Sequence, residues 1–374
     1  MSDGFPEVAF VHDWLVTMRG GEQVLAILHR NWPDAPIYTL LSDRKRLTSG
    51  LKNADLRHSY LQKIPGLSRF HRWLLPFYPA AAKKLQINTG PSIVISVSHS
   101  FAKGVPKPYG TFHLCYCLTP MRYAWQHPEL YFPKPLQILG ISNRWSRKLK
   151  QWDLESNRNV DRFVAISTVV QKRIKEWYGR ESDLIYPPVH TERFLHAERA
   201  PQDFYLVVSA LVPYKRVDLA IAACKRLGKK LVIAGDGPCR KALQIQAQGS
   251  EVEFLGYCPT QTLESLYAKA RALIYPQEED FGIASVEAQA ARCPVIAFRA
   301  GGALDTVIEN ETGLFFDYQS DESLMDAMER FEKTAFDPWA IRRNAFRFDE
   351  KVFEQSFREL VRKIRDGSLR SDVG

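Results

Sequence analysis

The stretch Tyr275-Pro-Gln-Glu-Glu-Asp-Phe-Gly-Ile-Ala-Ser-Val-Glu-Ala-Gln-Ala-Ala291 decides the fold. It begins at the end of a buried apolar run, and Pro276 predicts that a strand stops there. A segment of strong helix formers, 283–291, begins directly after Gly282. Because glycine has no side chain, we expect a ligand to approach the backbone N–H groups at the positive end of this helix.

Two glutamates of this stretch lie on either side of the predicted helix start. Seven residues separate Glu279, in the loop, from Glu287, inside the helix. Two carboxylates and a group of free N–H donors are therefore predicted around one small volume. That combination suits a ligand that carries both hydroxyl groups and phosphates, such as a nucleotide-sugar.

Strands and helices alternate on both sides of this stretch, and glycines follow many of the strands. The predicted strands are 8–11, 36–41, 93–97, 112–117, 162–166, 205–209, 230–234, 253–255, 272–275, 294–298 and 312–316. This alternation predicts an α/β fold with two facing, doubly wound, Rossmann-like sheets and a ligand cleft between them. We expect an N-terminal domain over 1–188, a C-terminal domain over 189–346, and a last helix, about 347–374, that packs back on the first domain.

The composition is that of a soluble globular protein large enough for two domains. The 374 residues are 45% hydrophobic and 25% charged. No apolar run reaches the length of about 18 residues that spans a bilayer, and the N-terminus shows no signal pattern. The six cysteines lack metal-ligand spacing, which indicates a reducing, cytoplasmic location.

Positive charge is concentrated in the N-terminal half. Residues 1–187 carry a net +12 and residues 188–374 a net −3, which together make the +9 of the chain. Between Leu56 and Gln151 the only acid is Glu129. We expect this half to face an anionic partner, and nucleic acid, a membrane surface and a phosphorylated substrate are the candidates. No recognition motif supports nucleic acid.

One stretch of this half combines aromatic and basic side chains. Leu67 to Pro79 places Trp, Phe and Tyr beside Arg69 and Arg72. Such a surface suits the headgroup region of an anionic membrane, which predicts peripheral contact with the inner face of the cell membrane. A core helix with a solvated basic edge is the alternative.

Candidate ligand-binding residues of the first half follow its predicted strands. His12 and Asp13 come after the first strand, ahead of the loop that contains Gly20 and Gly21. Strand, glycine loop and helix in that order suit a phosphate, although the full G-x-G-x-x-G is missing. His99 follows a later strand, and so do Arg122 and Tyr123. Ligands of α/β sheets bind at these carboxyl ends.

The second half carries its own candidates at the same places. Lys215 and Arg216 follow its first strand, and Gly235-Asp236-Gly237 follow the next. Tyr257 comes after a third strand and is preceded by Gly256.

Taken together, these motifs resemble those of the family-4 retaining glycosyltransferases, which have the two-domain glycosyltransferase-B fold. Glu279 to Glu287 matches the E-x7-E motif of that family, and the supporting segments are 211–215, 235–238, 254–256, 301–302 and Gly313. The nearest subgroup is similar to bacterial mannosyl- or glucosyltransferases of polysaccharide assembly. The segments that carry this second likeness are 12–14, 98–99, 121–123 and 186–189.

The resemblance implies a role for each candidate. Lys215, with Arg216 beside it, would bind the donor phosphates, and Glu279 and Glu287 would accept hydrogen bonds from sugar and ribose. His99 would lie beside the reacting carbon and contact the donor sugar. The remaining donor-side residues would be Gly20, Gly21, Gly235, Asp236, Gly237, Tyr257, Phe281, Gly282 and Ile283, and the acceptor-side residues His12, Asp13, Arg122 and Tyr123.

The reaction implied is retaining transfer of a hexose without a metal or another cofactor. The donor would be of the GDP-mannose or UDP-glucose type, and the acceptor a lipid-linked or polysaccharide-precursor glycan. Two departures from the family stand out, since Ala210 replaces a usual Arg and Leu118 a frequent His. A glycosyltransferase-like subunit with impaired catalysis and a sugar-nucleotide epimerase of the same architecture are therefore the alternatives.

Overall fold

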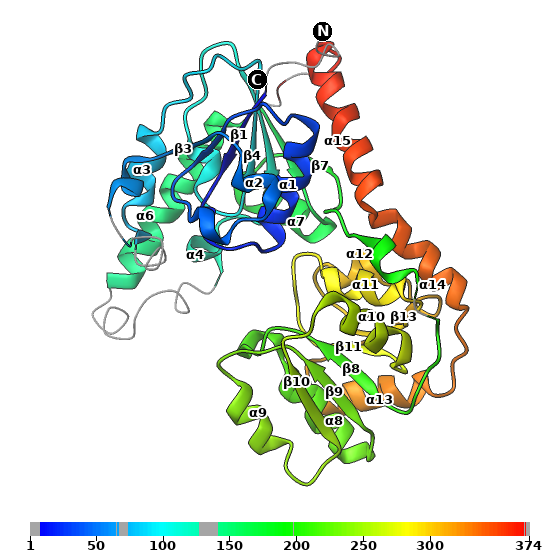
Figure 1. The fold of residues 1–374 in the computed structure, drawn as a ribbon. Helices are drawn as coiled ribbons and strands as arrows, with labels where there is room; N and C mark the ends of the chain where they lie inside the picture. The colour runs from blue at the N-terminus through cyan, green and yellow to red at the C-terminus, as the bar shows by residue number, and fades with distance from the viewer. Residues whose placement is uncertain are drawn as a thin grey trace. The chain divides into compact units, whose positions relative to one another are not determined.

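The computed structural model describes residues 8–64, 66, 74–126, 141–196, 198–369 and 371. The chain divides into two compact units. Unit 1 comprises Met1–Tyr186 and Glu354–Gly374, and unit 2 comprises Pro187–Phe353. Each unit has its own sheet (Figure 1), and each has its own hydrophobic core.

Unit 1 is built on a seven-stranded parallel sheet in the order β3-β2-β1-β4-β5-β6-β7. Its strands are β1 Val8–His12, β2 Ile37–Thr39, β3 Leu56–His58, β4 Ile93–Ser98, β5 Phe112–Cys117, β6 Arg162–Ala165 and β7 Ser182–Leu184. The central strands β1 and β4 are buried throughout because helices cover both of their faces. The strand order reverses between β1 and β4, which places the topological switch point there.

Helices from distant parts of the chain cover the two faces of this sheet. On one face, Phe10 packs against His29 of α1 (Gly20–Asn31), and Tyr116 packs against Phe357 of α15 (Glu350–Arg365). The opposite face holds a core shared with α3 (Tyr78–Lys84) and α6 (Ile141–Ser156). The remaining α-helices that the structure describes in unit 1 are α2 Ser49–Lys52, α4 Arg122–Trp125 and α7 Thr168–Arg173.

Unit 2 is built on a six-stranded parallel sheet in the order β10-β9-β8-β11-β12-β13. Its strands are β8 Tyr205–Val208, β9 Leu231–Ala234, β10 Val252–Gly256, β11 Leu273–Tyr275, β12 Val295–Phe298 and β13 Gly313–Phe316. Its helices are α8 Val217–Leu227, α9 Arg240–Gln246, α10 Thr260–Lys269, α11 Ile283–Ala290, α12 Ala303–Thr306, α13 Asp321–Phe331 and α14 Pro338–Ala345. The sheet reverses its order between β8 and β11.

The two doubly wound parallel sheets confirm the predicted fold class. Two strands were not predicted, β3 and β7, and each has only three residues. The helix that follows β6 is not regular, because α7 ends at Arg173 and continues as a π-helical turn over Ile174–Tyr178. The predicted aromatic and basic stretch lies outside the described residues from 67 to 73. Within the described part of the chain, no helix combines the length and the apolar character that crossing a bilayer requires.

Candidate functional site

In unit 2 the predicted donor-binding residues lie at the carboxyl ends of the strands. The chain leaves β8 towards Lys215 and leaves β11 towards Glu279. These two strands are neighbours, and the sheet changes direction between them. The structure therefore brings Lys215 and Glu279 to the switch point of this sheet, where α/β proteins bind their ligands.

Glu279 is held by three groups. Its Oε1 atom forms an ion pair with Lys215 Nζ, and its Oε2 atom accepts a 2.9 Å hydrogen bond from the hydroxyl of Tyr275. Its backbone carbonyl accepts a 2.7 Å bond from the N–H of Gly302. The Glu279 side chain remains 26% exposed, so its carboxylate is both oriented and accessible to a ligand.

Gly282 has a different role from the one that the sequence suggested. Its φ is 101°, and a Cβ atom at this position would lie 2.7 Å from the hydroxyl oxygen of Tyr275. The space left by the missing side chain is therefore occupied by Tyr275, and the approach of a ligand to the N–H groups that follow stays a prediction. The helix start that follows has no side-chain cap. Its first N–H groups and the positive end of the dipole thus stay available for an anion.

Glu287, the second glutamate, interacts with another buried tyrosine. Its Oε2 atom accepts a 3.1 Å hydrogen bond from Tyr267 of α10. Burial raises the pKa of Glu287 to about 7, although Tyr267 and the charge of Arg193 act in the opposite direction. A carboxyl group of this kind changes its charge near neutral pH, and a hydroxyl-bearing ligand would alter that equilibrium.

The other donor-side candidates lie on loops of the same edge. Gly235 N–H donates a 2.7 Å hydrogen bond to Gly256 O, which ties the loop after β9 to the residue before Tyr257. The Tyr257 side chain is 86% exposed. Asp236 forms an ion pair with Arg240 at 3.3 Å. Gly237 lies against the backbone of the loop after β8, where a Cβ atom would be 2.4 Å from Leu211 O.

Arg216 lies beside Lys215 but points to different partners. It forms an ion pair with Asp218 at 3.3 Å and hydrogen-bonds Gln319. Gln319 in turn donates a 2.9 Å bond to Pro276 O, at the start of the motif loop. Arg216 thus connects the loops after β8, β11 and β13, while Lys215 is the cation in contact with Glu279.

In unit 1, Asp13 and His99 form a pair. Asp13 is fully buried, and its Oδ2 atom lies 3.0 Å from Nδ1 of His99. Burial opposes the charged form of both groups, but their mutual attraction lowers the pKa of Asp13 to about 2 and raises the pKa of His99. The His99 side chain is 28% exposed and is therefore accessible to a ligand, whereas the Asp13 side chain that pairs with it is fully buried.

Three buried polar atoms lie at the ends of β1, β4 and β5, which are neighbours in the sheet. Among the described residues none of these atoms has a hydrogen-bond partner: His12 Nε2, Ser100 Oγ and Thr119 Oγ1. Buried polar groups without partners cost free energy, so their clustering at the switch point indicates a place that a polar ligand completes.

The glycine loop of unit 1 packs tightly against its neighbours. A Cβ atom on Gly21 would lie 2.6 Å from Leu118 Cδ1 and 3.6 Å from His12 Cε1. Gly20 opens α1 beside it. Leu118, which departs from the subgroup pattern, therefore occupies the space next to this loop. The candidates Arg122 and Tyr123 begin α4, and the charge of Arg122 acts to lower the pKa of His99.

Three functional candidates were missed by the sequence reasoning: Tyr267, Tyr275 and Trp14. The ring of Trp14 packs edge-on against His99, with 4.8 Å between centroids. Tyr275 is the last residue of β11, a position from which a side chain can reach the following loop. That position was the one available signal, because the partner of a buried tyrosine depends on packing that the sequence does not display.

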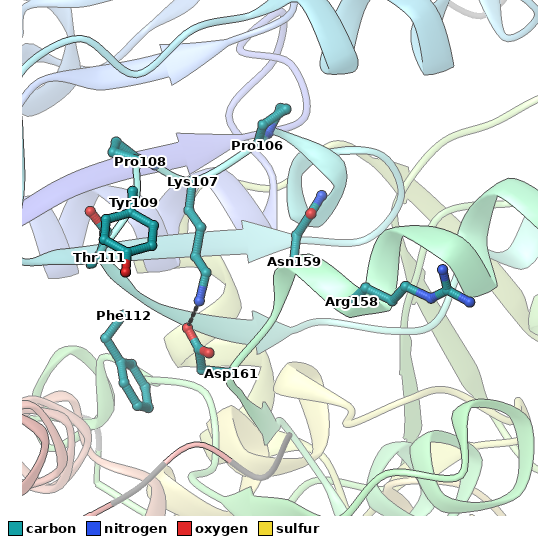
Figure 2. Close-up of a pocket in the computed structure, with 10 residues that line it drawn as sticks. Pro106, Lys107, Pro108, Tyr109, Thr111, Phe112, Arg158, Asn159 and Asp161 are labelled. Carbon is teal, nitrogen blue, oxygen red and sulfur yellow. Dashed lines mark hydrogen bonds and ion pairs between the residues drawn. The ribbon is translucent and has the colours of Figure 1, made fainter. Parts of the chain in front are cut away.

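A pocket of about 660 Å³ lies elsewhere in unit 1, before the first residue of β5 and of β6 (Figure 2). Lys107 points to Asp161 there, and the two form an ion pair. Since this is the amino edge of the sheet, we do not assign the donor to it. None of the predicted site residues lines this pocket.

Comparison with known proteins identifies the C-terminal unit. Residues 189–347 match the family model "Glycosyl transferases group 1". An uncharacterised glycosyltransferase of Methanocaldococcus jannaschii is 30% identical over 172 residues, 45% of this chain and 48% of that protein. A GDP-mannose-dependent alpha-(1-6)-phosphatidylinositol monomannoside mannosyltransferase of Mycobacterium tuberculosis is 31% identical over 199 residues, 45% of this chain and 52% of that protein. The chain thus spans about half the length of these relatives.

Solved structures extend the likeness in fold to nearly the whole chain. The lipopolysaccharide outer core galactosyltransferase WaaB is 18% identical with a TM-score of 0.69, over 97% of this chain and 99% of that one. Anabaena HepE in complex with UDP is 18% identical with a TM-score of 0.71, over 96% of this chain and 100% of that one. The chain therefore has the two-domain glycosyltransferase-B fold, and residues 189–347 of its C-terminal unit match the glycosyl transferases group 1 model.

Proposed function

We propose that this protein is a retaining glycosyltransferase that moves a hexose from a nucleotide-sugar to a lipid-linked or polysaccharide-precursor glycan. The observation that carries the proposal is the ion pair of Lys215 and Glu279 at the start of α11. A cation, an accessible carboxylate and an uncapped helix start lie together on unit 2. This set provides donors for phosphates and an acceptor for sugar hydroxyl groups.

Each successive part of the donor would contact different residues of this site. Lys215 and the first N–H groups of α11 would bind the diphosphate, while Glu279 would accept from the sugar and Glu287 from the ribose. Tyr257, on its exposed loop, would flank the base. The positive charge of Lys215 and of the helix end would stabilise the diphosphate as it departs. We therefore propose a reaction that needs no metal or other cofactor, and we expect turnover in excess EDTA to equal that in its absence.

The acceptor is assigned to unit 1, together with a contact from His99 to the transferred sugar. His99 is presented at the switch point, next to the three buried polar atoms without partners. Exposed cations on α6 favour a diphosphate-bearing lipid acceptor and peripheral contact with the anionic cytoplasmic face of a membrane, and they are Arg144, Arg147, Lys148 and Lys150.

Relatives guide the choice of donor. The mycobacterial relatives are named as GDP-mannose-dependent mannosyltransferases, and one structural neighbour was solved with UDP-glucose. We therefore propose a donor of the GDP-mannose or UDP-glucose type. Thermal unfolding with UDP, GDP and ADP ranks the bases, because a ligand that binds the native state raises the midpoint.

The decisive test is release of the nucleoside diphosphate when donor and a polyprenyl-diphosphate glycan are mixed with the protein. We expect Lys215→Ala and Glu279→Gln to lower this turnover by about tenfold or more, the worth of a hydrogen bond to a charged group. Lys333→Ala and Glu329→Gln change the same residue types at exposed positions, Glu329 on α13 and Lys333 in the turn after it, and serve as matched controls. Unchanged turnover in the first two variants would overturn the site assignment.

Two other outcomes identify the alternatives. An epimer formed from the donor alone would indicate a sugar-nucleotide epimerase. Binding of the donor without transfer to any glycan would indicate a subunit with impaired catalysis, for which Ala210 and Leu118 are the reason in the sequence.

A further inference from the structure

We infer that Tyr275 is a positioning residue that orients Glu279 towards the sugar of the donor. The inference rests on the proposed function and adds to it a residue outside the sequence motif. Tyr275 is the last residue of β11, and its side chain is 1% exposed. It therefore acts on a substrate only through Glu279, whose Oε2 atom accepts its hydroxyl proton at 2.9 Å.

The Tyr275 hydroxyl keeps its proton because it is buried. Burial raises the pKa of Tyr275, although the side chain of Gln277 acts in the opposite direction. The phenol therefore stays neutral and able to donate, and Glu279 Oε2 accepts its hydrogen bond.

The surrounding backbone is shaped to admit this contact. Gly282 leaves room for the Tyr275 hydroxyl, as a Cβ atom there would lie 2.7 Å from its oxygen. Gly301 lies against the backbone of Glu279, where a Cβ atom would be 2.3 Å from Glu279 O. Gly302 N–H binds that same carbonyl. Three glycines of two separate loops and one hydroxyl therefore determine where the carboxylate lies.

The arrangement separates the two oxygens of Glu279 by function. Oε2 is bound to Tyr275, while Oε1 is paired with Lys215. When a bound diphosphate pairs with the ammonium group of Lys215, Oε1 of Glu279 loses its ion-pair partner and becomes the acceptor for a sugar hydroxyl. Oε2 keeps its hydrogen bond from Tyr275. Without the Tyr275 hydroxyl, the Glu279 carboxylate is free to rotate and to follow Lys215.

The test is Tyr275→Phe in the full chain, which removes the hydroxyl alone. We expect the affinity for the intact nucleotide-sugar and kcat/KM to fall about tenfold to a hundredfold, as for a lost hydrogen bond to a charged group. The affinity for the nucleoside diphosphate without sugar should change less than about threefold, because Lys215 and the start of α11 remain. A merely structural role would move both affinities together.

Tyr205→Phe is the matched control. Tyr205 is also buried in unit 2, and its hydroxyl donates to a glutamate, Glu332, at 2.5 Å. We expect this control to keep wild-type affinity for donor and diphosphate. If Tyr275→Phe binds nucleotide-sugar and turns over as the wild type does, the inference is wrong. If the wild type itself neither binds nor turns over any donor, the proposed function fails instead.

Discussion

Asp13 Oδ2 lies 3.0 Å from His99 Nδ1, and the same carboxylate accepts hydrogen bonds from three backbone N–H groups of the loop after β4. Those groups belong to His99, Phe101 and Ala102. The loop that presents His99 is therefore folded around one fully buried charge. Because Asp13 follows β1 and His99 follows β4, the contact also joins the two strands at the switch point.

Replacing Asp13 by Asn should destabilise unit 1 and alter His99. We expect a loss of about 3 kcal/mol in the free energy of unfolding, since the amide turns a donor towards N–H groups that need an acceptor. The pKa of His99 should fall, because Asp13 raises it more than Glu22 does. Denaturant titration measures the first effect, and the NMR pH titration of the His99 ring measures the second.

The pH dependence of the free energy of unfolding of the wild type follows from the same pair. The contribution of His99 to the free energy of unfolding is present in full below its ordinary pKa of 6.5. It is lost as the pH rises through the raised pKa of the folded state. The contribution of Asp13 is present above 3.8 and is lost as the pH falls towards about 2. Asp34 is an exposed aspartate of the same unit, and Asp34→Asn is the control. It should leave unchanged both pH ranges over which stability is lost. An unchanged His99 titration in the Asp13 variant would contradict the pairing.

Gly282→Ala should cost more stability than an ordinary substitution of a left-handed glycine. The new methyl group meets both an unfavourable φ of 101° and the hydroxyl of Tyr275 at 2.7 Å. We expect a loss of more than about 2 kcal/mol, compared with about 1 kcal/mol for Gly249→Ala. Gly249 has a φ of 74° with nothing within 4 Å of the Cβ position, so it isolates the backbone cost.

The double variant with Tyr275→Phe completes this test. Removing the hydroxyl relieves the crowding, so the cost of Gly282→Ala should shrink when Tyr275 is already Phe. Additive losses in the free energy of unfolding would show that Gly282 and Tyr275 are not coupled.

The elements that position the site could be predicted because their causes are local. Apolar runs ended by Pro or Gly mark the buried parallel strands, as at β11 and Pro276. The cap of α7 was also predictable, since Ser167 accepts a hydrogen bond from Val170 N–H. The short strands β3 and β7 were missed because their residues are partly exposed and mixed in polarity.

The contacts within the candidate site could not be predicted because they join distant residues. Eighty-six positions separate Asp13 from His99, and twenty separate Tyr267 from Glu287. Sequence spacing placed each of these residues at a strand end or on a helix, but side-chain packing chose its partner. The contact between Tyr275 and the space left by the missing side chain of Gly282 could not be predicted for the same reason.

Ala210→Arg should strengthen donor binding if the departure from the family pattern weakens it. Ala210 is exposed and follows β8 on the way to Lys215. One added guanidinium on this loop supplies a second cation for the diphosphate. We expect about tenfold tighter binding of the nucleoside diphosphate at low salt, measured by isothermal titration calorimetry.

The salt dependence and a neutral variant show whether charge is the cause. The gain should diminish as ionic strength rises, because the loop is solvent-exposed and screened. Ala210→Gln adds a polar side chain without charge and should bind as the wild type does. Equal affinities for the Arg and Gln variants would mean that the missing cation is not limiting.

Glu287→Gln should make unit 2 more stable at high pH and should weaken its binding of the donor. In the wild type, burial raises the pKa of Glu287 to about 7 from an ordinary 4.5, so the native state binds the proton more tightly than the unfolded state. Stability is therefore lost as the pH rises from 4.5 through 7, by up to about 3 kcal/mol. The Gln variant does not ionise and should keep its free energy of unfolding over this range, while Glu329→Gln on exposed α13 should retain the wild-type slope.

Calorimetric titration with UDP or GDP should show weaker binding for Glu287→Gln alone, because a carboxylate accepts a ribose hydroxyl better than an amide does. A variant with the wild-type pH slope and full affinity would mean that this carboxyl group is neither strained nor in contact with the ribose.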